Sequence, residues 1–259
     1  MCSASQAPTA RPAPGLFTNA QTEEDLERDS GRPSGMACGR CRMSTAHHGV
    51  AVESPLADDL FRLGHHDSTG RLRLHEQVAG LGLAAALLGE LCLAGHVTVY
   101  SGHVAVVDRS PPADALAHTV LDQLVGEAQV RQLRAWLPFL ARDAHDQVAQ
   151  RLVRAGHLRP VRGRWSRRVA YEPVDSTVAV WPEVRLRYTL HGHRQWDYSD
   201  MVLAGLVAAT GLSEQILWGF HGDMRRWFLS LTDWLPAPLA ELVAHTEAAV
   251  GNAVLTHRT

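Results

Sequence analysis

The stretch from Val78 to Ala94, VAGLGLAAALLGELCLA, constrains the fold more than any other part of the chain. It is the longest apolar run in the sequence, and it predicts a helix that is apolar on all faces and must be covered by protein or lipid. A membrane span needs about 20 apolar residues, whereas this run rises only ~26 Å as a helix and contains Glu90. The sequence therefore predicts a buried central helix. Its glycines should let neighbouring helices approach closely, and Glu90 should have a polar partner.

The composition sets the size of the core and excludes one class of partner. The chain has 259 residues, of which 46% are hydrophobic, so it can bury a sizeable core. Its net charge of -2 excludes a polyanion binder that acts through bulk charge. All 25 basic residues are arginine. With the excess of alanine, leucine and valine, this usage indicates the codon bias of a high-GC bacterial genome.

Residues 1–53 are rich in Pro, Ser, Thr, Gly and charge, and we predict a disordered tail because so little apolar surface cannot offset the entropy of ordering. The true start is left open between Met1, Met36 and Met43. Cys38 and Cys41 have half of a zinc-ligand spacing, but no second pair follows, so we predict no metal and no redox role. No basic segment followed by an apolar one marks a secretory signal, which makes the cytoplasm the expected location.

Residues 54–259 are expected to form one helical domain with two small β-hairpins. The segment His96–Val107 alternates apolar and polar residues around Ser101-Gly102, which predicts the first hairpin. His157–Tyr171 predicts the second, with its turn near residues 162–164. His65–Gly70 is expected to be an exposed polar turn, because loop histidines are usually exposed.

The remaining elements are predicted from apolar spacing and from helix stop signals. Ser54 is expected to cap the first helix, ahead of Pro55 and a stripe of leucines. Further helices are expected at residues 116–124, at 130–136 with a break near Pro138, at 148–155 ending at Gly156, from Pro182 onward, at 201–210 ending at Gly211, and at 239–255. The predicted fold class is mainly α: a buried central helix wrapped by amphipathic helices.

Four stretches in this order resemble the Golgi phosphoprotein 3 family of peripheral membrane proteins. They are the opening helix and acidic turn, a GL…ELxLxG helix, a proline-containing link into a DxxL-type helix, and an RLVxxGxL segment, at residues 56–70, 82–95, 111–121 and 148–158. The resemblance implies a bundle of central helices sheathed by amphipathic ones. It also implies binding of phosphatidylinositol 4-phosphate on membranes and, in eukaryotes, recruitment of Golgi glycosyltransferases, a role that cannot be transferred to a bacterium.

The family's lipid site is carried over residue by residue. Aligned on the ELxLxG motif, the family's headgroup tryptophan falls on His75 and its first arginine on Ala84. Anchored on Gly156, its two later arginines fall on Arg142 and His145. The resemblance therefore implies a headgroup site of His75, Arg142 and His145 in one shallow pocket with Ala84 at its edge. A surface ion pair of Arg142 with an acid such as Asp146 is the alternative.

The second predicted hairpin is a separate indication of membrane binding. Its basic residues flank a tryptophan, which pairs charge for anionic headgroups with a ring suited to the membrane interface. The predicted membrane-contact residues are Arg159, Arg162, Arg164, Trp165, Arg167 and Arg168. Two alternatives stay open: a solvated strand face, or a winged-helix-like element at residues 148–171 that binds nucleic acid.

An enzyme is the third class considered, and the chain has no Walker-type Gly-Lys-Ser/Thr, no Gly-x-Ser-x-Gly and no His-Glu-x-x-His. We therefore predict a non-enzymatic peripheral membrane protein without cofactor, at the inner face of the membrane, which binds phosphoinositide or another anionic lipid. Oligomerisation through the hairpins and a membrane-protein client are left open. The main alternative partner is nucleic acid.

Overall fold

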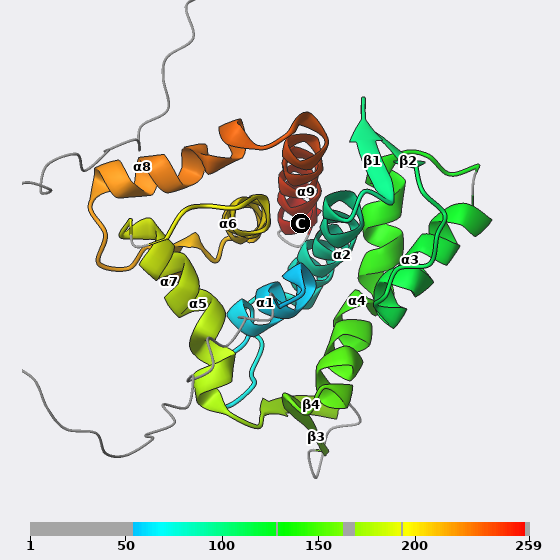
Figure 1. Cartoon of the computed structure of the whole chain (residues 1–259). Coiled ribbons are helices and arrows are strands. Elements are labelled where there is room, and N and C mark those ends of the chain that lie inside the picture. Colours follow the sequence, from blue (N-terminus) through cyan, green and yellow to red (C-terminus); the bar gives the residue numbers. More distant parts are fainter. Residues whose placement is uncertain (1–53, 128, 163–168, 193, 257–259) are drawn as a thin grey trace, which may run out of the picture. The chain divides into compact units, whose positions relative to one another are not determined.

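The computed structural model describes residues 54–127, 129–162, 169–192 and 194–256. These residues are mainly helical, with two antiparallel two-stranded sheets, and this confirms the predicted fold class (Figure 1). The predicted tail, residues 1–53, lies outside the described residues. In chain order the elements are α1 (Leu56–Leu63), α2 (Glu76–Leu93), β1 (Val97–Tyr100), β2 (His103–Val106), α3 (Ala115–Gly126), α4 (Leu133–Arg154), β3 (Leu158–Arg162), β4 (Val169–Pro173), α5 (Ser176–Leu190), α6 (Tyr198–Thr210), α7 (Ser213–Ile216), α8 (Gly222–Ser230), the 3-10 helix η1 (Leu231–Trp234) and α9 (Ala237–Thr256).

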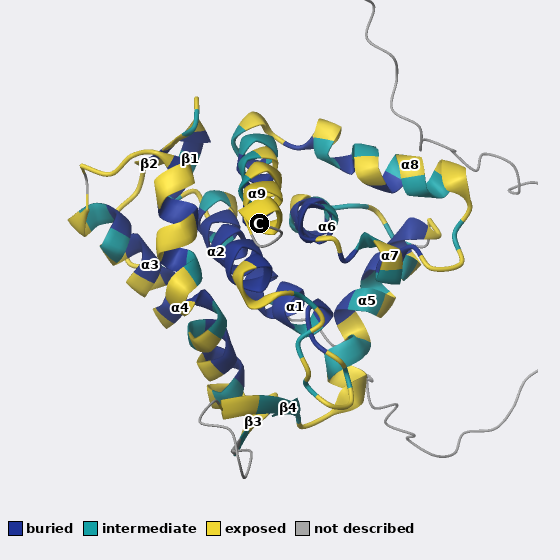
Figure 2. Cartoon of the chain, turned by 180° about the vertical axis from the view of Figure 1, so that it is seen from behind, coloured by how far each residue is buried: buried dark blue, intermediate teal, exposed yellow. Residues whose placement is uncertain are grey.

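Helix α2 is the buried central helix that the apolar run predicts. It packs against α1, α4, α6 and α9, and most of it is dark blue in the burial view (Figure 2). Two of its glycines allow close approach: a Cβ on Gly80 would lie 2.6 Å from the Ala141 carbonyl oxygen of α4, and one on Gly89 would lie 2.9 Å from Leu56 of α1. Among the described helices, α2 alone is long and apolar enough to cross a membrane, and 72% of it is buried within the protein, as in a core helix.

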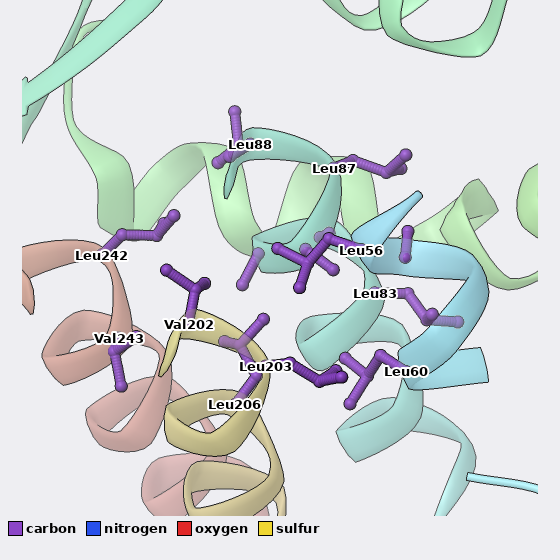
Figure 3. Close-up of a cluster of buried hydrophobic side chains, with 14 of the residues drawn as sticks. Leu56, Leu60, Leu83, Leu87, Leu88, Val202, Leu203, Leu206, Leu242 and Val243 are labelled. Atoms are coloured by element: carbon purple, nitrogen blue, oxygen red, sulfur yellow. The ribbon is translucent and has the colours of Figure 1, made fainter. Parts of the chain in front are cut away.

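The core lies where α1, α6 and α9 meet α2. Figure 3 shows apolar side chains of these four helices pointing toward one another. Each buried leucine of this kind contributes about 1.5 to 3 kcal/mol through the hydrophobic effect. The labelled side chains are Leu56 and Leu60 of α1, Leu83, Leu87 and Leu88 of α2, Val202, Leu203 and Leu206 of α6, and Leu242 and Val243 of α9.

The first hairpin has the predicted turn. Tyr100 pairs with His103, and Ser101 and Gly102 between them have φ values of 51° and 73°, the left-handed conformation of a two-residue hairpin loop. Both turn N–H groups donate to the Glu241 carboxylate of α9, which holds the tip of the hairpin against that helix. The second hairpin also forms, with Leu158 of β3 opposite Pro173 of β4, and its turn lies outside the described residues.

Two predicted helix boundaries at prolines are wrong. The helices expected at 130–136 and 148–155 are one helix, α4, which contains Pro138. Pro138 stands early in α4, where loss of its N–H removes one bond near the helix end and the packed helix continues. Pro182 also lies inside a helix, α5, because Asp175 caps that helix earlier by accepting a hydrogen bond from Thr177 N at 2.8 Å.

Candidate functional site

Arg151 of α4 is buried and makes ion pairs with three carboxylates. Its Nε lies 2.7 Å from Asp58 Oδ1 of α1, and its two terminal nitrogens each lie 3.0 Å from the Glu90 carboxylate of α2. Nη1 also lies 3.1 Å from Asp114 Oδ2, the N-cap residue of α3. Glu90 accepts a further bond from Ala57 N at 2.8 Å. The polar partner that the sequence predicts for Glu90 is therefore confirmed, and this arginine holds four helices together.

Burial raises the pKa of the two neighbouring acids of α1, Asp58 and Asp59. Burial raises the pKa of Asp58 to about 6, although the Arg151 guanidinium acts against this rise. Burial also raises the pKa of Asp59, against the opposing charge of Arg185, whose Nη2 lies 2.8 Å from Asp59 Oδ2. Arg185 of α5 also pairs with Asp200 of α6. The two carboxylates therefore connect α1 to opposite neighbours: Asp58 to α4 and Asp59 to α5 and α6.

Of the lipid-site residues predicted from the sequence, His145 contacts a buried histidine, His65, outside this ion-pair network. His65, at the end of α1, is 7% exposed, stacks on the Phe61 ring and bonds through Nδ1 to the Phe61 carbonyl at 2.6 Å. Its Nε2 lies 3.1 Å from Nε2 of His145. We assign the hydrogen on His65 Nδ1 to the Phe61 bond, so His65 Nε2 is the acceptor and His145 Nε2 is the donor. Burial lowers the pKa of His65 to about 4.

The expectation that His65–Gly70 is an exposed turn is therefore wrong for His65, although His66 beside it is exposed. The signal that sequence reasoning missed is the spacing of His65 from Phe61. Because residues four positions apart lie on the same face of a helix, His65 lies one turn after the buried Phe61 and on the same face.

Arg142 is exposed and lies one turn before His145 on α4. Among the described residues its guanidinium has no ion pair or hydrogen bond, and Asp146 lies instead 3.4 Å from His145 Nδ1. The alternative of an Arg142–Asp146 ion pair is not found. A second arginine, Arg73, lies beside the His65 backbone, because Arg73 Nε donates to the His65 carbonyl at 2.9 Å.

His75 is the N-cap residue of α2, with an exposed ring whose Nδ1 accepts a hydrogen bond from Gln77 N at 3.4 Å. It precedes Gly80, where the backbone of α2 meets Ala141 of α4, next to Arg142. The hydrogen bonds and ring contacts of His145 go to α1, Asp146 and β4. The structure thus joins His145 to His65 directly, while it places His75 on the adjacent helix end.

The prediction for Ala84 is wrong. Its side chain is fully buried in the core cluster and does not lie at the edge of a surface pocket. The reason is that α2 is covered on all sides at this level, so no open surface reaches it.

The second hairpin adjoins the same place. The Tyr171 ring of β4 lies 6.2 Å from the His145 ring, and a Cβ on Gly70 would fall 1.9 Å from the Tyr171 carbonyl oxygen, so the α1–α2 connection rests on β4. Arg159 of β3 is exposed and pairs across the hairpin with Glu172 at 2.8 Å. Of the other predicted membrane-contact residues, the Arg162 side chain and all of Arg164, Trp165, Arg167 and Arg168 lie outside the described residues.

A hollow between α1 and the hairpin is too small for a headgroup. It is lined by Phe61, His65, His66 and Tyr171 among others, and its volume of about 20 Å³ leaves space for about one water. Within the described ranges, no three His, Cys, Asp or Glu side chains gather as metal ligands would, and Cys38 and Cys41 lie outside those ranges.

The chain belongs to the Golgi phosphoprotein 3 (GPP34) family, whose model matches residues 56–246. The comparison with curated proteins finds no match. The four stretches that carry the family resemblance meet at Arg151. Arg151 belongs to one of them, and its ion-pair partners Asp58, Glu90 and Asp114 each belong to one of the other three. In this chain the shared motifs therefore build the scaffold, and the candidate lipid residues stand apart from that ion-pair network.

Proposed function

We propose that this protein is a non-enzymatic peripheral membrane protein that binds anionic lipid, of the phosphoinositide kind, at the inner face of the membrane. The observation that carries the proposal is Arg142, an exposed arginine that is unpaired among the described residues and stands one turn from His145. An arginine can donate two parallel hydrogen bonds to a phosphate, and this one is not occupied by an acid.

The surroundings supply further positive charge. Arg73 lies on the α1–α2 connection, which contacts β4, and the predicted arginine hairpin consists of β3, β4 and the turn between them. At about 1 kcal/mol for each basic residue near an anionic surface, a few such residues give weak, reversible binding. Membership of the Golgi phosphoprotein 3 family is consistent with this role.

The winged-helix alternative has less support. It would place residues 148–156 on nucleic acid, but Val148, Ala149, Arg151 and Leu152 are buried against the rest of the protein. A helix with this face covered has few side chains left for a groove.

Vesicle flotation tests the proposal. The purified full chain should co-float with vesicles that contain phosphatidylinositol 4-phosphate or phosphatidylserine, float much less with phosphatidylcholine alone, and lose binding as salt rises above about 0.15 M. Equal flotation with neutral vesicles would overturn the electrostatic account. Tight binding to duplex DNA without vesicle binding would favour the winged-helix alternative.

A further inference from the structure

Helix α5 has the reverse of the usual arrangement of charged and apolar side chains. A surface helix ordinarily turns its charged residues to the solvent and its apolar residues to the core. In α5, every exposed residue after Thr177 is apolar or aromatic. These residues, the α5 stripe, are Val178, Trp181, Val184 and Tyr188, which are 37% to 54% exposed. Their spacing of three or four positions places them along one face of the helix.

The three charged side chains of α5 are engaged by the rest of the protein. Glu183 accepts a hydrogen bond from Gln215 Nε2 of α7 at 2.5 Å. Arg185 pairs with acids of α1 and α6, and Arg187 Nη1 donates to two backbone carbonyls in and just after α7. Leu186 is buried between these contacts. The bonds fix which face of α5 is turned to the protein, so the helix cannot rotate to bury the stripe.

The α5 stripe begins next to the proposed lipid site. Helix α5 starts just after the end of β4, the second strand of the predicted arginine hairpin (Figure 1). Val178 and Tyr171 line the same small hollow as His65. The Tyr171 ring lies 6.2 Å from the His145 ring. A membrane in contact with His145 would therefore be close to the first turn of the stripe.

The side chains of the stripe suit a lipid surface. Trp and Tyr are enriched at membrane–water interfaces, where the ring is buried and the polar N–H or O–H stays hydrated. The stripe itself carries no charge that would have to enter the membrane. A helix with such a face lies in the plane of the interface and buries that face at the boundary between headgroups and acyl chains.

We infer that the α5 stripe contacts the interfacial region of an anionic membrane and adds apolar burial to the charge attraction at Arg142 and His145. The inference rests on the lipid-binding proposal above, and it assigns the stripe to the same membrane. A second copy of the chain is the other occupant that the apolar face could accept. Continuity of the stripe with the hollow beside His65 favours the membrane.

Vesicle flotation of Trp181→Ser/Val184→Ser tests the inference, on phosphatidylcholine vesicles that contain phosphatidylinositol 4-phosphate. We expect a melting temperature close to that of wild type, because both side chains are exposed. The partition coefficient should be lower by about tenfold, since apolar burial in the membrane is lost. Trp234→Ser is the matched control and should float as wild type: Trp234 is 51% exposed, and its helix η1 packs against α6, α8 and α9.

Quenching by brominated lipid tests the contact of Trp181 directly. Trp181→Phe keeps an apolar ring and should float as wild type. When the same vesicles contain dibrominated phosphatidylcholine, bromine quenches the fluorescence of tryptophans at the membrane. The quenched part of the emission should therefore be smaller for Trp181→Phe than for wild type. Equal quenching of the two proteins would overturn the inference, and this result decides the matter if the double serine variant does not fold.

Flotation of the folded Trp181→Ser/Val184→Ser variant equal to wild type, or an equal loss for Trp234→Ser, would also overturn the inference. So would a wild-type dimer that the double variant dissociates without a change in flotation, because the stripe would then bind a second copy. Failure of the headgroup site is distinguishable. In that case Arg142→Gln floats as wild type and the double serine variant is impaired, whereas failure of this inference alone leaves Arg142→Gln as the impaired variant.

Discussion

Arg142 and Arg151 lie on the same helix, about two and a half turns apart, and have opposite environments. Arg151 is 8% exposed and ion-paired with three carboxylates, whereas Arg142 is exposed and unpaired among the described residues. The difference arises from what covers α4: the helices α1, α2 and α3 bring acids to Arg151, and no acid of the described residues pairs with Arg142.

The family motifs and the proposed lipid-binding residues are therefore separate. Glu90 and Arg151 belong to two of the motifs that define the resemblance, and they bind each other. Matching those motifs therefore predicts the fold, whereas the proposed lipid site consists of residues outside them.

The largest expected effect is on Arg151. Arg151→Met leaves Asp58, Glu90 and Asp114 without their cation, and removal of one partner of a buried ion pair costs about 3 to 5 kcal/mol. Urea unfolding at pH 7 measures the loss. Arg142→Met is the matched control, since a surface change away from any partner should stay within about 0.5 kcal/mol. Equal stability of the two variants would remove the distinction between the two arginines.

His65 gives the next largest effect, through pH. Its folded pKa of about 4 lies below the ordinary value of 6.5, so the unfolded chain binds the proton first and stability falls as pH drops from about 6.5 through about 4. The full difference amounts to roughly 3 kcal/mol. His65→Gln should remove this loss, as measured by urea unfolding at pH 7, 5.5 and 4. A variant that loses as much stability as wild type on acidification would show that His65 does not titrate this way.

Asp58 is expected to change the stability with pH in the opposite direction to His65, over part of the same pH range. Its folded pKa of about 6 lies above the ordinary 3.8, so the folded chain binds the proton first and stability from this group is lost as pH rises from about 3.8 through about 6. Asp58→Asn keeps an acceptor for Arg151 without the buried charge. We expect the variant to be more stable than wild type at pH 7 by about 1 kcal/mol. We also expect its stability to fall more steeply than that of wild type on acidification. Strong destabilisation at pH 7 would mean that the Asp58 charge is needed to hold Arg151.

Local signals in the sequence predict much of the fold. The central helix follows from its apolar run, the first hairpin from Ser101-Gly102, and the end of α6 from Gly211, which has φ of 84°. Each of these depends on residues close together in the chain. The continuity of α4 through Pro138 could not be predicted, because packing against α2 outweighs the loss of one hydrogen bond.

The candidate site is less predictable because it depends on contacts between distant segments. His65 and His145 are far apart in sequence, and only the packing of α1 on α4 joins their rings. The burial of Ala84 and the pairing of Arg151 have the same origin. Sequence alone gives no means to tell a solvated arginine from a buried one on the same helix.

Flotation of the Arg142→Gln/His145→Gln variant on vesicles with phosphatidylinositol 4-phosphate, with its melting temperature measured in parallel, tests the central claim most directly. We expect the variant to fold, with a somewhat lower melting temperature because His145 no longer contacts His65. Its partition coefficient should be at least about fivefold lower than wild type, since one basic residue at an anionic surface is worth about 1 kcal/mol. Arg134→Gln, at the start of α4 where Arg134 Nε bonds Gln132 at 2.8 Å, serves as the control and should float as wild type. Flotation of the folded double variant equal to wild type would contradict the assignment of Arg142 and His145 to the lipid site.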